Sequence, residues 1–230
     1  MTVEYVLGLG DDALVAAQRL SWWCARAPEL EEDVALANIA LDQLGVARLL
    51  LTYAGEREGA GRDEDALAYL RDDREYRNCL LVELPERDFA VTMVKLLFLS
   101  AYQLPLYDSL AAGPDERLAA IGAKARKESA YHLDHSSLWV VRLGDGTAES
   151  HERAQAAVDE LWPYTHEMCG DLREPWLATV SAVLSEATLT RPADGGWAPG
   201  GGREGRHTEA LSYLLAEMQV VHRAHPGARW

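Results

Sequence analysis

The stretch ELEEDVALANIALDQLGVARLLLTYAGE, residues 29–56, is the longest run of helical periodicity in the chain and decides the fold class. The residues that recur at three- and four-residue steps are Leu30, Val34, Ala37, Leu41, Leu44 and Arg48. This spacing is typical of one face of an α-helix. Gly45 lies inside the pattern and costs up to about 1 kcal/mol relative to alanine, so we expect another backbone to pack closely there.

Similar periodicity continues outward from this stretch in both directions. Further helices are expected over 11–27, 64–71, 88–111, 114–143, 148–168, 174–189 and 207–223. We expect the acidic pair Asp11 and Asp12 to mark the start of the first helix, and Pro105 to kink the helix that contains it. No strand alternation is visible. The pattern therefore predicts an all-α bundle formed by a single domain over residues 1–230.

The charge balance limits the classes of function that fit. The chain has 37 acidic and 22 basic residues, a net charge of −15, and 48% hydrophobic residues. Such a charge repels nucleic acid and anionic membranes, so neither is an expected partner. The cysteines, Cys24, Cys79 and Cys169, are widely spaced, and no basic leader or 18-residue apolar run occurs. We therefore expect a cytoplasmic protein that does not cross a membrane.

Two helix pairs repeat weakly along the chain. The first pair carries Gln18, Asp42 and Gly45, and the second carries Gln103, Glu128 and Tyr131. Di-iron bundles place a Glu on two helices and Glu-x-x-His on the other two. The corresponding residues here are Gln18, Asp42-x-x-Gly45, Gln103 and Glu128-x-x-Tyr131, a degenerate set that could not balance two ferrous ions.

The stretch KESAYHLDHSS, residues 127–137, offers a different candidate site. At about 100° per residue, His132 and His135 lie within about 40° of Glu128 around a helix, so the three could meet one metal ion. No second Glu-x-x-His occurs to complete the site. The alternatives are a buried polar stripe, in which Glu128, Tyr131, His132 and His135 satisfy one another, and a partner-facing stripe. The same stripe continues through Trp139 and Arg142.

Two further groups of residues are candidates for contact with partners. Aromatic residues are enriched at interfaces, which makes Trp22, Trp23, Trp139 and Trp197 candidates. Arg203, Arg206 and His207 form a small basic exception to the acidic charge. They lie at the end of a glycine-rich loop, residues 191–206, whose length is typical of functional, partner-bound or mobile loops. Thr208 or His207 is expected to cap the last helix.

Three long motifs resemble one family. They are ELEEDVALANIALDQLGVAR (29–48), KESAYHLDHSSLWVVRLGDGTAES (127–150), and GREGRHTEALSYLLAEMQ with the terminal PGARW (202–230). In order and over nearly the whole chain, they resemble the structural C subunits of ring-1,2-phenylacetyl-CoA epoxidases, bacterial multicomponent monooxygenases of aerobic phenylacetate catabolism.

The resemblance implies a ferritin-like four-helix bundle with additional helices, and a non-catalytic structural role. It implies that the di-iron cofactor belongs to a catalytic A subunit, with which this chain pairs, and that this subunit holds no cofactor. It also implies contacts with other subunits of the complex. A homo-oligomer remains possible. The alternative is a metal-dependent oxidase or ferritin-like module that uses Glu128, His132 and His135.

Overall fold

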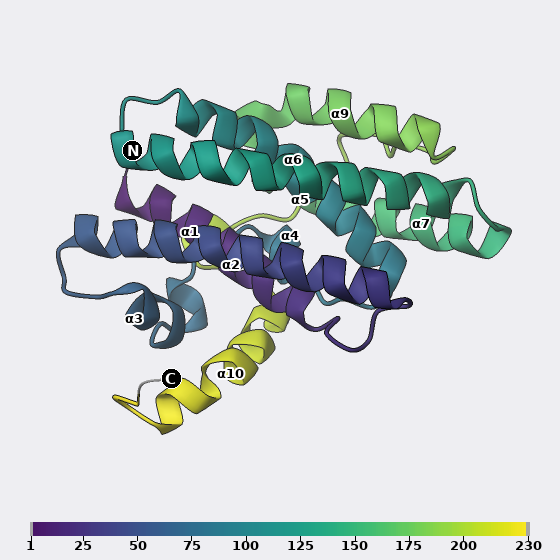
Figure 1. Ribbon diagram of the computed structural model, residues 1–230. Coiled ribbons are helices and arrows are strands. Elements are labelled where there is room, and N and C mark those ends of the chain that lie inside the picture. Colours follow the sequence, from purple (N-terminus) through teal and green to yellow (C-terminus); the bar gives the residue numbers. More distant parts are fainter. Residues whose placement is uncertain (1, 229–230) are drawn as a thin grey trace. The chain divides into compact units, whose positions relative to one another are not determined.

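The computed structural model describes residues 2–228, and all regular secondary structure in that range is helical. The last two residues of the terminal PGARW motif lie outside the described residues. The chain divides into two compact units: residues 1–85 with 200–230, and residues 86–199. Each unit contains one pair of long helices, as the weak sequence repeat suggests (Figure 1). The single domain over residues 1–230 stays a prediction.

The first unit is built on α1 (Val3–Ser21) and α2 (Leu30–Glu58), which lie side by side along their length. Their close approach depends on Gly10, because a Cβ there would lie 2.9 Å from the Leu51 side chain. The remaining helices of this unit are α3 (Glu64–Tyr69), η1 (Asp73–Glu75), α4 (Leu80–Glu83), η4 (Gly202–Glu204) and α10 (Glu209–Ala224).

The start of α1 differs from the sequence prediction. Thr2 caps the helix, and its side chain accepts a hydrogen bond from the Tyr5 amide at 3.3 Å. Asp11 and Asp12 therefore lie in the middle of α1, where both are buried. The prediction that this acidic pair begins a helix was wrong, because distant basic residues let two carboxylates enter the interior.

The second unit is built on α5 (Phe89–Ala111) and α6 (Glu116–Gly144). The side chains of Asp88 and Asp115 cap these helices by accepting hydrogen bonds from backbone amides. Gly122 lets the pair approach, since a Cβ there would lie 2.8 Å from the Tyr107 carbonyl oxygen. α5 continues through Pro105 to Ala111, and the kink at Pro105 stays a prediction.

The rest of the second unit covers this helix pair. Its elements are α7 (Ala148–Leu161), η2 (Trp162–Tyr164), α8 (Thr165–Cys169), η3 (Gly170–Leu172) and α9 (Arg173–Glu186). The predicted helix over 148–168 thus ends at Leu161, where a Trp-Pro-Tyr turn follows. Phe98, Trp162 and Trp176 pack edge-on or tilted at centroid distances of 5.2–5.8 Å. Trp176 Nε1 donates a 2.8 Å hydrogen bond to the Phe98 carbonyl.

The helix α2 has two apolar faces. Its buried face includes Leu36, Ile39, Val46 and Leu50. The periodic stripe that stands out in the sequence, from Leu30 to Leu44, lies instead largely on the outside. α2 and α5 are both long and apolar enough to span a membrane, but 83% of the apolar window of α5 is buried, against 44% for α2. Such composition is weak evidence of a membrane span, because core helices share it.

Candidate functional site

The predicted polar stripe lies on α6, but its members differ in exposure. His132 is buried, Glu128 and His135 are half-buried, and Tyr131 is 63% exposed. Lys124 Nζ lies 3.4 Å from a Glu128 carboxylate oxygen, one helical turn away. Tyr131 therefore points outward from α6, whereas the neighbouring His132 points inward. The choice between a buried stripe and a partner-facing stripe stays a prediction.

Serine hydroxyls connect the interior of α5 and α6 beside His132. Ser136 Oγ donates a 2.8 Å hydrogen bond to the His132 carbonyl oxygen and lies 3.4 Å from Ser100 Oγ. Ser100 Oγ in turn donates to the Leu96 carbonyl. Both hydroxyls donate to carbonyls of their own helices, which is a common way to satisfy buried serines.

At the C-terminal end of the stripe, Trp139 and Arg142 take part in aromatic contacts within the second unit. Trp139 packs edge-on against Phe89 at 4.9 Å, and the Arg142 guanidinium lies 5.3 Å from the Trp139 ring. Of the tryptophans proposed as interface candidates, Trp22 and Trp197 are exposed and Trp139 is half-buried. Trp23 is buried, so it is not available as a surface residue of this chain.

The degenerate di-iron positions divide between the two units. Gln18 lies on α1 and Asp42 and Gly45 lie on α2, all half-buried. Gln103, on α5, is 2% exposed, and Glu128 and Tyr131 lie on α6. The set supplies only two carboxylates and no imidazole, and its tyrosine points to solvent. These residues do not fit a carboxylate-bridged di-iron centre.

Among residues 2–228, no group of three or more His, Cys, Asp and Glu side chains lies close enough to hold a metal ion. Glu128, His132 and His135 are therefore not brought together as a three-ligand site in this structure. That the isolated chain holds no metal stays a prediction, which elemental analysis can test.

The first unit contains a buried ionic network that the sequence analysis missed. Asp11 and Arg71, which are 0% and 2% exposed at the side chain, form a bidentate ion pair. The Arg77 amide also donates to Asp11, at 2.8 Å. Burial alone would lower the pKa of Arg71, but the attraction of Asp11 raises it overall. The pair thus ties α1 to the segment after α3.

A second pair joins α1 to the glycine-rich loop. Arg203 Nη2 lies 2.7 Å from Asp12, and Arg203 Nη1 donates to the carbonyls of Gly8 and Arg77. The Cys79 amide donates to Asp12 at 2.7 Å. Burial raises the pKa of the Asp12 carboxyl, against the opposing effect of Arg203. The end of the loop is therefore fixed to the first unit.

The third part of the network surrounds Glu83. Its carboxylate lies 2.8 Å from His207 Nδ1, accepts from Asn78 Nδ2 at 2.9 Å, and accepts from the Thr208 amide at 2.6 Å. Burial favours neutral His207, but the hydrogen bond and charge of Glu83 outweigh it, so the pKa of His207 is raised. Thr208 occupies the N-cap position of α10, as predicted, but its side chain makes no capping hydrogen bond.

These contacts correct one sequence prediction. Arg203 and His207 are engaged with buried carboxylates and do not form a basic surface. Arg206 alone of the three is exposed, and it pairs with Glu204 at 2.8 Å. No short motif signalled the network, because its acids and bases lie up to 191 residues apart. The unusual position of two adjacent aspartates within an apolar helix is the one signal available in the sequence.

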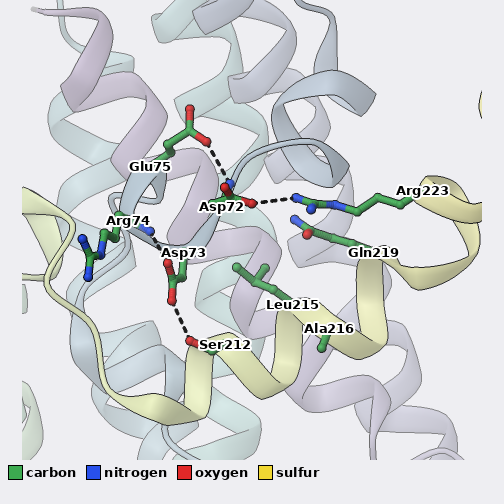
Figure 2. A pocket seen from close by; sticks show the side chains of 9 residues that line it. All are labelled: Asp72, Asp73, Arg74, Glu75, Ser212, Leu215, Ala216, Gln219 and Arg223. Atoms are coloured by element: carbon green, nitrogen blue, oxygen red, sulfur yellow. Dashed lines mark hydrogen bonds and ion pairs between the residues drawn. The ribbon is translucent and has the colours of Figure 1, made fainter.

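A crevice of about 630 Å³, lined mainly by charged and polar residues, lies in the first unit between η1 and α10 (Figure 2). Its acidic residues are already engaged: Asp72 with Arg223 at 3.2 Å, and Asp73 with Ser212 at 2.6 Å. Glu75 accepts from the Asp72 amide at 2.8 Å, which closes the turn. The Asp72–Arg223 and Asp73–Ser212 contacts hold α10 against η1, so these carboxylates have a structural role.

Comparison with known proteins places the chain in a family. A family model described as "Phenylacetic acid catabolic protein" matches residues 1–171 and 169–230. The chain is also 45% identical over 244 aligned residues to the C subunit of the 1,2-phenylacetyl-CoA epoxidase of Escherichia coli (strain K12), covering 98% of each chain. The family is helical and ferritin-like, which confirms the predicted fold class. The chain therefore belongs to the phenylacetic acid catabolic protein family.

Proposed function

We propose that this chain is a structural, non-catalytic subunit of a 1,2-phenylacetyl-CoA epoxidase, and that it pairs with the catalytic A subunit of that complex. The carrying observation is 45% identity to a protein named as the C subunit of that enzyme, over 98% of both chains. A subunit of a multi-subunit enzyme has partner subunits, so an assembly of several chains is expected. The aerobic breakdown of phenylacetate is the corresponding pathway.

The donor set supports a non-catalytic role. Gln18 and Gln103 carry no charge and Gly45 carries no ligand atom, so two ferrous ions would lack two of their four compensating carboxylates and both imidazoles. In this proposal the di-iron centre belongs to the catalytic subunit and the present chain holds no cofactor. Its contribution is to stabilise the catalytic subunit through an interface of standard size or larger.

The charge of the chain supports the choice of partners. A net charge of −15 disfavours nucleic acid and anionic membranes and favours protein partners with basic surfaces. We place the complex in the cytoplasm. Other subunits of the epoxidase are further partners in this proposal.

The proposal is tested by producing the chain alone and together with the catalytic subunit from the same source. We expect the two chains to co-purify, iron to be present in the complex, and the isolated chain to contain far less than one iron per chain and no epoxidase activity. One or more iron ions per isolated chain, lost in Glu128→Ala or His132→Ala, would instead support the metal-dependent oxidase.

A further inference from the structure

The outer face of α2 is an apolar surface that the fold leaves exposed. We define this α2 outer face as Leu30, Val34, Ala37, Leu41 and Leu44. Leu30 is 75% exposed, Val34 55%, Leu41 63% and Leu44 36%. Single exposed leucines are ordinary on protein surfaces, but a continuous row of them along one helix is typical of an interaction site.

The spacing of the α2 outer face matches that of a helix-packing seam. Its members follow one another at steps of four, three, four and three residues, an average of 3.5. A seam of that period keeps facing one partner helix over its whole length. At about 1.5 Å per residue the seam from Leu30 to Leu44 is about 21 Å long, close to four turns of a partner helix.

The α2 outer face also contains a hollow. A pocket of about 340 Å³ is lined by Ala37, Leu41 and Leu44 from α2, Gln18 from α1 and Met218 from α10, all within the first unit. The pocket is mainly apolar and open to solvent. Large side chains of a partner helix pack into such holes, and methionine adapts its shape to the side chain that enters.

Charge around the seam restricts the kind of occupant. Glu29 and Glu31 are exposed beside Leu30, and Glu32 and Asp33 are half-buried there, whereas Arg48 follows the seam at its other end. An occupant that is basic where it meets the Leu30 end would complement this arrangement. A second copy of the chain would bring together two molecules of charge −15, and anionic lipid would meet the same acidic cluster.

We infer that the α2 outer face is the docking surface for an amphipathic helix of the catalytic partner subunit, with apolar residues at 3–4 spacing and basic residues at the Leu30 end. This inference rests on the proposed function, which supplies the partner. The helix covers the seam and inserts one large apolar side chain into the pocket beside Leu41. A second packing face explains why α2 is strongly apolar although only 44% of its apolar window is buried within this chain.

The test is binding between the purified catalytic subunit and variants of this chain. Val34→Glu combined with Leu41→Glu should weaken the dissociation constant at least tenfold, because two charges would enter an apolar seam. The matched control is Leu138→Glu on α6, an exposed leucine (57%) outside the surface, which should bind like the wild type. Far-UV circular dichroism and thermal unfolding verify that each variant is folded.

A charge variant tests the orientation of the partner helix. Glu29→Lys with Glu31→Lys should weaken binding and reduce its dependence on salt, since acidic contacts with a basic helix end are lost. Unchanged affinity in both variants, with the wild type binding, overturns the docking surface but leaves the proposed function intact. Failure of the wild type itself to bind the catalytic subunit overturns the proposed function.

Two further measurements exclude other occupants. In analytical ultracentrifugation, the chain alone should form no dimer through this surface. A dimer that Val34→Glu with Leu41→Glu abolishes would show that a second copy of the chain occupies the surface. Flotation with vesicles of phosphatidylcholine, with and without phosphatidylglycerol, should show no binding. Binding to vesicles that the same variant abolishes would overturn the inference in favour of a membrane.

Discussion

Each of the two units is built on a pair of long helices, but their interiors differ in chemistry. In the first unit, α1 carries Asp11 and Asp12 into the interior, where Arg71 and Arg203 neutralise them. In the second, α5 is almost wholly apolar and packs against Trp162 and Trp176, with its buried ion pair, Lys95–Glu86, near the start of the helix. Ionic interiors demand particular partners, whereas apolar interiors accept many of similar volume.

The largest expected effect is on the ionic interior. Arg71→Met would leave the Asp11 carboxylate buried without its guanidinium, so we expect a loss of about 3–5 kcal/mol in the free energy of unfolding. Urea denaturation followed by circular dichroism measures it. Adding Asp11→Leu should recover part of the loss, because no uncompensated charge then remains. A cost below about 1 kcal/mol for the single change would contradict a structural role for the pair.

A smaller effect is expected in the aromatic interior. Trp176→Phe removes the hydrogen bond to the Phe98 carbonyl and some volume, which should cost about 1–3 kcal/mol. Trp197→Phe, at a 70% exposed position, serves as the control and should stay within about 0.5 kcal/mol of the wild type. Equal effects at the two positions would remove the distinction between core and surface tryptophans.

The Glu83–His207 contact should make the first unit sensitive to pH. Because the pKa of His207 is raised by folding, its contribution to stability is fully present below the unfolded pKa of about 6.5 and is lost as pH rises through the folded pKa. His207→Gln should therefore be less stable than the wild type by about 1–2 kcal/mol at pH 5.5, with a smaller gap at pH 8.5. Thermal unfolding across that range measures this difference in stability. A difference that grew with rising pH would contradict a raised pKa for His207.

The smallest effect is expected at Glu128, a half-buried member of the α6 stripe. Glu128→Gln removes the Lys124 ion pair, which is partly solvated, so the loss should be below about 1 kcal/mol. The change should leave co-purification with the catalytic subunit intact. A loss of several kcal/mol, or of bound metal, would show that Glu128 does more than form this ion pair.

The helical class, the two helix pairs and most helix boundaries could be predicted from the sequence, because they depend on local periodicity and capping. Leu30, Val34, Leu41 and Leu44 correctly indicated a helix but not which face it buries, since α2 is apolar on two sides. Asp11 and Asp12 were placed at a helix start because their partners, Arg71 and Arg203, are distant in sequence. The roles of Glu128, His132 and His135 stay predictions, because side-chain contacts of that kind depend on tertiary packing.

The order of the chain has a consequence for how the protein is made. Residues 86–199 form a unit that interrupts the first unit, whose last part begins at residue 200. Arg203 and His207, the cations that neutralise Asp12 and Glu83, are therefore synthesised after the whole inserted unit. Because domains fold as units during translation, the inserted unit can complete its interior on the ribosome first. The unit that contains Asp12 and Glu83 is therefore finished after the unit inserted into it.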